Sequence, residues 1–352
     1  MGRQTIAHNN TIVLFADPTV IMPAYCTVAS VVRHLPPDTN VTVFGIDFEA
    51  QTLADLVPAF RSLHPSVELL PIASDDTFGS AIWTTKYGGK ATWGRLFLDQ
   101  LLPDCLDRVL YLDCDMLVCR PLQDLFGSSL HGHAVGACDD AAPYLSDITG
   151  EFRTRIGLDA DGRYLNSGLL LLDWQKLLQE DILGKARSAL NGLDVTTELP
   201  FADQDILIIV IDGNWQRLDP RWNLQRVSLL ESNSHQPWIA HFTGPRKPWK
   251  ASCHDQLSEY IKQYIAIYEA QPSLARYWPA ALPSRTGLLA RRIWRSTKRH
   301  AMYHLARAMP WLFRPDVKQR IGERYHGNDA KSAVFNELIK NAQASSCPST
   351  RR

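Results

Sequence analysis

The fold can be worked out from one stretch, Arg108-Val-Leu-Tyr-Leu-Asp-Cys-Asp-Met-Leu-Val-Cys119, in which two carboxylates interrupt an apolar run. A short apolar segment such as residues 109–112 is typical of a buried strand, central and parallel in its sheet. Burying the charges of Asp113 and Asp115 is costly unless they are paired or bound to a metal. Alternate residues of a strand share a face, so both could reach one cation if the strand continues through them. The alternative is an ordinary pair of turn or helix-capping aspartates.

Alternating strand and helix patterns precede this stretch. The strand patterns cover residues 11–15, 41–46 and 67–70, and the helix patterns cover residues 23–35 and 53–60. This order predicts a parallel sheet with right-handed crossovers, and hence an α/β fold. Ligands bind such sheets beyond the carboxyl ends of strands, where Asp17 and Asp113 fall. Neither GxGxxG nor GxxxxGK[ST] occurs, which argues against a dinucleotide dehydrogenase or a P-loop enzyme.

Later segments place more polar residues near the ends of predicted elements. The predicted helices cover residues 91–102, 174–190, 203–210 and 256–269, and the predicted strands cover residues 134–138 and 164–173, with another beginning at residue 238. The long polar and aromatic loop over residues 141–163 is interpreted as a lid or an acceptor wall.

Four of these residues have a structural explanation beside a functional one. Arg95 could be an ordinary solvated helix residue, and Asp203 could be a helix N-cap. Gly168 interrupts a strand, which indicates a close approach of the backbone to a ligand, a bulge or a simple bend. A lone histidine such as His241 is more often structural than a ligand, but its place just before a glycine turn favours a site.

Composition is that of an ordinary globular protein. With 45% hydrophobic and 21% charged residues, 352 residues can hold one large α/β domain and an appendage. No stretch approaches the ~18 uninterrupted apolar residues of a membrane span, and the N-terminus lacks a signal-peptide pattern. The seven cysteines form no CxxC pair, which indicates reduced thiols. We therefore expect a cytoplasmic protein, peripheral on the inner face of the cell membrane.

A basic C-terminal segment is hidden by the formal net charge of zero. Residues 285–324 contain eleven Lys or Arg against Asp316 and Glu323, a local charge of +9. Basic residues interleaved with apolar and aromatic ones are found at membrane surfaces, on nucleic acid or on solvated helices. We expect an anionic membrane surface as the partner, and no nucleic acid. The expected division is a catalytic domain at 1–283, a basic helical region and possible anchor at 284–343, and a disordered tail at 344–352.

Four motifs together resemble the family 8 retaining glycosyltransferases, especially the bacterial lipopolysaccharide and lipooligosaccharide galactosyl- and glucosyltransferases. The motifs are Tyr-Leu-Asp113-Cys-Asp115, Leu-Asn166-Ser-Gly168, Asp203-Gln204-Asp205 and His241-Phe-Thr-Gly244-Pro-Arg-Lys247-Pro-Trp249, in that order. The resemblance covers about residues 11–255. It implies a single Rossmann-like, nucleotide-sugar-binding domain of the GT-A type, with a mostly parallel central sheet.

The resemblance also implies a nucleotide-diphosphate-sugar donor, usually UDP-linked, and a set of residues around it. Asp113, Asp115 and His241 would hold Mn²⁺, with Mg²⁺ as an alternative. The donor-binding residues that it implies are Ala16, Asp17, Arg95, Asp113, Cys114, Asn166, Asp203, Gly244 and Lys247, with Lys247 on the diphosphate. Gln204 is placed beside the anomeric carbon and, with Asp203, is implied to be catalytic. The family position commonly held by Asn is Thr19 here, so part of the ribose or uracil contact differs.

The expected reaction transfers galactose or glucose from a UDP-sugar to a lipid-linked glycan such as a lipopolysaccharide core, or to another oligosaccharide acceptor. The metal and Lys247 would stabilise charge on the departing UDP. An amide is a poor nucleophile, so Gln204 favours front-face substitution with retention, unless Asp203 or Asp205 acts as nucleophile. The alternatives are a self-glucosylating, glycogenin-like protein and an inactive sugar-nucleotide-binding scaffold, with a metal hydrolase as a distant third.

Overall fold

The computed structural model describes most of the chain up to residue 278. The described residues are 9–78, 89–141, 154, 163–192, 199, 201, 203–229, 236–244, 247–249, 257–278 and 305. The expected loop at 141–163 lies almost entirely outside them, as do the basic region at 284–343, apart from Leu305, and the tail at 344–352. The division into a catalytic domain and a C-terminal region therefore stays a prediction.

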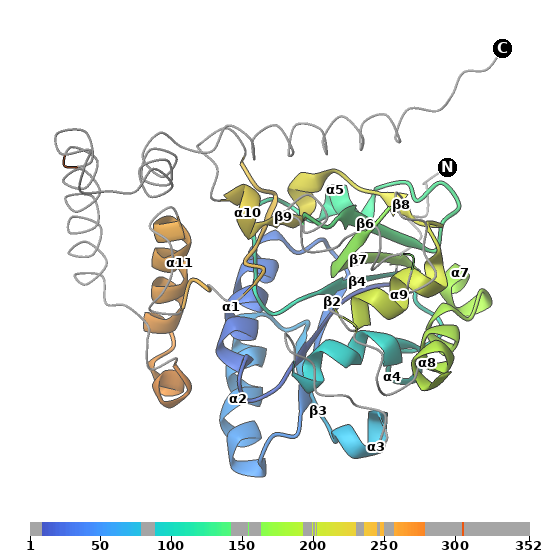
Figure 1. The fold of residues 1–352 in the computed structure, drawn as a ribbon. Helices are drawn as coiled ribbons and strands as arrows, with labels where there is room; N and C mark the ends of the chain where they lie inside the picture. Colours follow the sequence, from blue (N-terminus) through green and yellow to red (C-terminus); the bar gives the residue numbers. More distant parts are fainter. Residues whose placement is uncertain are drawn as a thin grey trace, which may run out of the picture.

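A seven-stranded sheet forms the centre of the described structure, in the order β3-β2-β1-β4-β7-β6-β8 (Figure 1). Its strands are β1 (Asn10–Ala16), β2 (Thr39–Ile46), β3 (Val67–Ile72), β4 (Arg108–Leu112), β6 (Val135–Asp139), β7 (Leu165–Asp173) and β8 (Gln216–Arg217). β4 is central as expected, parallel to β1 but antiparallel to β7. β7 is also antiparallel to β6, and the remaining pairs are parallel. The predicted α/β fold with a mostly parallel sheet is confirmed.

A smaller sheet continues from the carboxyl end of β4. It consists of β5 (Met116–Val118), β9 (Leu224–Gln225) and β10 (Ile239–His241), in the order β5-β10-β9. β10 is antiparallel to β5 and parallel to β9. This sheet brings the segment around residue 241 beside the central stretch, although more than a hundred residues separate them in the sequence.

Both faces of the central strands are buried. Along β1, Ile12, Leu14 and Ala16 belong to one hydrophobic core, while Val13 and Phe15 belong to a second core on the opposite face. The first core is covered by α1 (Ile21–Val31), α2 (Ala50–Leu63) and α11 (Ser258–Glu269), and the second by η3 (Lys90–Phe97), α8 (Ile182–Gly192) and α9 (Asp203–Ile211) (Figure 1). Burial on both faces explains why these strands read as continuous apolar runs.

The remaining helical elements are short and lie mostly between the strands. They are η1 (Val32–His34), α3 (Ser74–Phe78), α4 (Leu98–Leu101), α5 (Gln123–Phe126), α7 (Trp174–Gln179), η5 (Pro220–Asn223), α10 (Arg226–Leu229) and η7 (Pro272–Tyr277). Within the part of the chain described, no helix is both long and apolar enough to cross a membrane.

Two predicted helices differ from the structure. Residues 91–102 form the 3-10 helix η3 followed by the short α4, because η3 packs tightly on β1. A Cβ atom on Gly94 would lie 2.2 Å from Cδ1 of Phe15, so only glycine permits this approach. Residues 174–190 form two helices, α7 and α8, because Asp181 between them has a φ of 48°. This is the left-handed region, which Asp tolerates better than most residues and in which a helix ends.

Candidate metal and donor site

The two aspartates of the central stretch lie in a turn. β4 ends just before residues 113–115 and β5 begins just after them, so the condition that one strand continues through both carboxylates is not met. Hydrogen bonds from neighbouring elements hold the turn instead. Asp113 N donates to Gly168 O at 2.8 Å, and Thr27 Oγ1 from α1 donates to Cys114 O at 2.7 Å. The turn directs both carboxylates toward the same side chain, His241.

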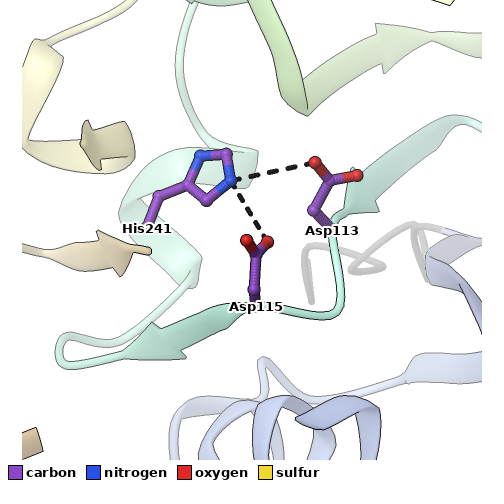
Figure 2. A group of neighbouring side chains, drawn as sticks. All are labelled: Asp113, Asp115 and His241. Carbon is purple, nitrogen blue, oxygen red and sulfur yellow. Dashed lines mark ion pairs between the residues drawn. The ribbon is translucent and has the colours of Figure 1, made fainter. Parts of the chain in front are cut away.

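His241 completes a group of three possible metal ligands. Its Nε2 atom lies 3.2 Å from Oδ1 of Asp115 and 3.8 Å from Oδ2 of Asp113 (Figure 2). One ligand atom from each residue lies within 4.8 Å of the other two. The pairing of β10 with β5 produces this arrangement, since Phe242 N donates to Asp115 O at 3.0 Å. Two carboxylates and one imidazole are a donor set that suits a divalent cation such as Mn²⁺ or Mg²⁺.

Gly168 makes room for this group. A Cβ atom on this glycine would lie 2.4 Å from Cε1 of His241 and 2.8 Å from Oδ2 of Asp113. Both distances are shorter than a non-bonded contact allows, so a side chain at this position would displace one of the ligands. The strand glycine is therefore a place of close approach, and the groups that approach it are side chains of the site. The close approach of a ligand to Gly168 stays a prediction.

Lys247 lies against the same group. Its ammonium forms an ion pair with Oδ2 of Asp115 and donates to Phe242 O at 2.8 Å. Burial alone would raise the pKa of Asp115, but the ammonium of Lys247 and the adjacent imidazole of His241 outweigh it and lower that pKa well below the ordinary value. Gly244, with a φ of 76°, provides the left-handed turn between His241 and Lys247. Asp115 is therefore ionised and available as a ligand at neutral pH.

Arg95 joins the ligand group to the opposite side of the site. Its side chain is only 3% exposed, which rules out the solvated interpretation. Nη2 donates to Oδ1 of Asp113 at 2.8 Å, Nε lies 2.9 Å from Oδ2 of Asp203, and Nη1 donates to Ser167 Oγ at 2.6 Å. Burial opposes its charge, but Asp113 and Asp203 together raise the pKa of Arg95. The guanidinium is thus a fixed cation shared by two predicted site residues.

The predicted sugar-side residues form one buried hydrogen-bond network. Asn166 Nδ2 and Gln204 Nε2 donate to Oδ2 of Asp140, at 2.8 and 3.0 Å respectively. Gln204 Oε1 accepts from Ser167 N at 2.9 Å, so both ends of the amide are held. Burial raises the pKa of Asp203 to about 7, and Arg95 offsets this effect only in part. Asp203 is the first residue of α9 and points to Arg95, so its role exceeds that of a helix cap.

The predicted uridine-side residues lie at the carboxyl end of β1. Ala16 is fully buried, and Asp17 follows it. Asp17 Oδ1 accepts from Thr19 N at 2.8 Å and from Thr19 Oγ1 at 2.6 Å, so the residue that departs from the family pattern orients Asp17. The Cys114 thiol donates to Phe15 O at 2.8 Å and is buried, which leaves the main chain of Cys114 as its available binding group.

Two buried residues of this region were missed in the sequence. Asp140 accepts from both sugar-side amides, and Asn223 contacts both His241 and Asn166. Asp140 could have been found in the sequence, because it comes just after the predicted strand over residues 134–138, as Asp113 comes just after β4. Asn223 could not, because it ends the short 3-10 helix η5 and stands outside any periodic pattern.

Two solved structures have a fold similar to that of this chain. A structure of the galactosyltransferase LgtC in complex with donor and acceptor sugar analogues matches 74% of this chain and 95% of its own, at 22% identity and a TM-score of 0.61. The apo structure of the bifunctional glycosyltransferase WbbM matches 76% of this chain and 52% of its own, at 18% identity and a TM-score of 0.59. The fold is that of the GT-A type glycosyltransferases.

The sequence gives the family. Residues 11–253 match the model for glycosyl transferase family 8, and the chain belongs to this family and is a glycosyltransferase. General stress protein A of Bacillus subtilis is 27% identical over 49% of this chain and 64% of its own length. The lipopolysaccharide 1,2-glucosyltransferase of Escherichia coli is 30% identical over 47% and 51% respectively. The lipopolysaccharide 1,3-galactosyltransferase of Salmonella typhimurium is 26% identical over 51% and 55%. The matches thus span about half to two thirds of these relatives.

Proposed function

We propose that this glycosyltransferase moves a hexose, galactose or glucose, from a UDP-sugar to a lipid-linked glycan such as a lipopolysaccharide core, with retention and with Mn²⁺ at Asp113, Asp115 and His241. The observation that carries the proposal is the meeting of this ligand group with the sugar-side network around Arg95. The names of the glucosyl- and galactosyltransferase relatives support the choice of sugar and acceptor.

The ligand group fits a divalent ion by its chemistry. Three protein ligands leave coordination positions for phosphate oxygens, which is the usual way in which Mg²⁺ and Mn²⁺ join a protein to a nucleotide. Lys247 and Arg95 add two positive charges to the carboxylates of Asp113, Asp115 and Asp203. Burial keeps Asp203 only partly ionised near pH 7, so the site without an ion carries a small excess of negative charge. A bound cation would supply the missing charge and stabilise the diphosphate as it departs.

The residues on the sugar side are proposed to orient the donor. Gln204 is held at both ends, by Ser167 and Asp140, so its amide is a fixed hydrogen-bonding group beside the anomeric carbon. Its poor nucleophilicity favours front-face substitution. In that step the bond from the anomeric carbon to the diphosphate breaks while the acceptor oxygen bonds on the same face, and the acceptor proton passes to the leaving phosphate. The product is an α-glycoside.

The proposal is tested by UDP release across UDP-galactose, UDP-glucose and UDP-N-acetylglucosamine, with Mn²⁺ and with excess chelator. Asp115→Asn keeps the shape of the side chain but removes the charge, so turnover should fall by about a hundredfold or more. The matched control is Asp124→Asn, since Asp124 pairs only with the surface residue Arg120 among the described residues. Undiminished turnover in chelator would contradict the metal assignment, and a β-anomeric product would contradict retention.

A further inference from the structure

Asn223 stands between the two halves of the site. It is 2% exposed and ends η5, the 3-10 helix that leads into β9. Its Oδ1 atom lies 2.8 Å from Nδ1 of His241, and its Nδ2 atom lies 2.8 Å from Oδ1 of Asn166. One buried amide therefore touches a metal-side residue and a sugar-side residue that come from different strands, β10 and β7.

The hydrogen bonds of Asn166 settle which way each amide points. Oδ1 of Asn166 accepts from Gly168 N at 3.1 Å, and a backbone N–H can only donate. Nδ2 of Asn166 then faces Oδ2 of Asp140 at 2.8 Å, which agrees with a carboxylate acting as acceptor. Two independent partners, Gly168 N and Asp140, thus fix which end of the Asn166 side chain is the oxygen and which is the nitrogen.

The orientation of Asn166 in turn determines the orientation of Asn223 and the protonated nitrogen of His241. Because Oδ1 of Asn166 is an acceptor, the atom of Asn223 that meets it must be the donor Nδ2. The other end of that amide, Oδ1, therefore faces His241 and can only accept, so Nδ1 of His241 must carry a proton. The opposite ring nitrogen, Nε2, faces Asp113 and Asp115 and is then the one left to bind an ion between them.

We propose that Asn223 is a positioning residue that fixes the ring and tautomer of His241 for metal binding and couples it to Asn166 on the sugar side. The proposal rests on the ion assigned under the proposed function. Partners that hold the second nitrogen of a metal-bound histidine typically change metal affinity by about 10- to 100-fold. The position of Asn223 is itself rigid, because Asp219 caps η5 through Arg221 N at 3.0 Å and Trp238 N donates to Arg221 O at 2.9 Å.

The test measures Mn²⁺ binding to the full chain by titration calorimetry, with thermal unfolding in chelator as a measure of stability. Asn223→Leu removes both hydrogen bonds and should weaken Mn²⁺ binding by about 10- to 100-fold. Asn223→Asp keeps the acceptor for His241 but cannot donate to Asn166. It should retain at least the wild-type Mn²⁺ affinity, while the KM for the donor rises.

Gln225→Leu is the matched control. Gln225 is also a buried amide in the same segment, and its side chain forms two hydrogen bonds, with Ala141 N and Asp139 O, neither of which involves His241. This variant should lose stability as Asn223→Leu does, yet bind Mn²⁺ like the wild type. A purely structural role for Asn223 would instead make the two leucine variants alike in both measurements.

The outcomes distinguish failure of the proposed Mn²⁺ site from failure of the proposed role of Asn223. A wild-type protein that binds no Mn²⁺ would contradict the proposed ion and, with it, this coupling. Wild-type binding with an unaffected Asn223→Leu variant would overturn the role of Asn223 alone. If Asn223→Leu fails to fold, Asn223→Asp decides, because loss of Mn²⁺ affinity with an unchanged donor KM is the opposite of the predicted pattern.

Discussion

Arg95 shows how a single residue holds this site together before any ligand binds. Its guanidinium contacts Asp113 on the metal side, and Asp203 and Ser167 on the sugar side, while remaining 3% exposed. A buried charge is tolerated only where partners satisfy it. Here Asp113 and Asp203 satisfy the charge of Arg95, so one guanidinium links the carboxylates of the two halves.

Gly168 carries the sharpest prediction at this scale. Gly168→Ala should lower Mn²⁺ affinity and UDP release by about tenfold or more, because the new methyl group would displace His241 or Asp113. Gly192→Ala is the control: a Cβ atom there meets nothing within 4 Å, and a helical alanine is slightly favourable. Both variants are compared by metal titration and turnover. Equal behaviour of the two would show that the crowding at Gly168 relaxes without cost.

Individual site residues could be predicted where a charged side chain follows an apolar segment of the sequence. Asp113 and Asp115 could be predicted because two carboxylates follow an apolar strand. His241 came from the resemblance, since nothing in the sequence alone joins it to residues more than a hundred positions earlier. Asn223 could not be predicted, because its partners lie 18 and 57 residues away and a buried amide leaves no pattern.

At the scale of elements, α11 closes the core beneath the small sheet. Tyr264 in this helix is fully buried, with ring centroids 5.9 Å from Phe242 and 5.2 Å from Trp249. These two residues flank the turn that carries Lys247, so the packing of α11 supports the ligand group from behind. Ile261, Ile265 and Tyr268 of the same helix are buried too, so this face of α11 is part of the core.

Tyr264 gives a prediction of unusual sign. Its hydroxyl is buried and has no hydrogen-bond partner within the described part of the chain, which costs about 1–3 kcal/mol. Tyr264→Phe removes the hydroxyl and keeps the ring, so the free energy of unfolding in urea should rise by about 1 kcal/mol. Tyr264→Ala should instead lower it by about 3–5 kcal/mol. A clear loss of stability in Tyr264→Phe would reveal a partner for the hydroxyl.

Helices and strands could be predicted where the hydrophobic pattern is long. The predicted bounds differ from the structure where contacts with another element end the helix or strand. Every strand expected in the central sheet is present within a few residues of its predicted bounds. The helix predicted over 91–102 failed because Gly94 lets the chain pack on Phe15, a contact that no periodicity encodes. β4 does not continue through Asp115, because the chain turns at Cys114, where Thr27 in α1 donates a hydrogen bond to the carbonyl of Cys114.

At the scale of the whole molecule, the site lies where the carboxyl ends of β1 and β4 meet the small sheet. Ligands bind at this edge in open α/β sheets. The direction of the strands also changes here, because β4 is parallel to β1 on one side and antiparallel to β7 on the other. The basic segment at 284–343 lies outside this frame in the sequence, and all four site motifs precede residue 250.

We propose that this segment anchors the enzyme on the inner face of the cell membrane. Each basic residue near an anionic surface contributes about 1 kcal/mol, and salt screens the effect. Truncation after Leu282 should therefore preserve UDP-sugar hydrolysis and abolish co-sedimentation with anionic vesicles at low salt. Neutral vesicles are the control. Equal pelleting of both proteins would end the anchor proposal, and an insoluble truncated protein would indicate that the segment covers the core.

The central claim is that Asp113, Asp115 and His241 hold the divalent ion that binds the donor diphosphate. The most direct test is a crystal grown with Mn²⁺ and UDP, measured for anomalous scattering by manganese. We expect one strong anomalous peak, coordinated by carboxylate oxygens of Asp113 and Asp115 and by Nε2 of His241, and in contact with the diphosphate. A peak bound by other residues, or bound UDP with no peak at these three, would contradict the claim.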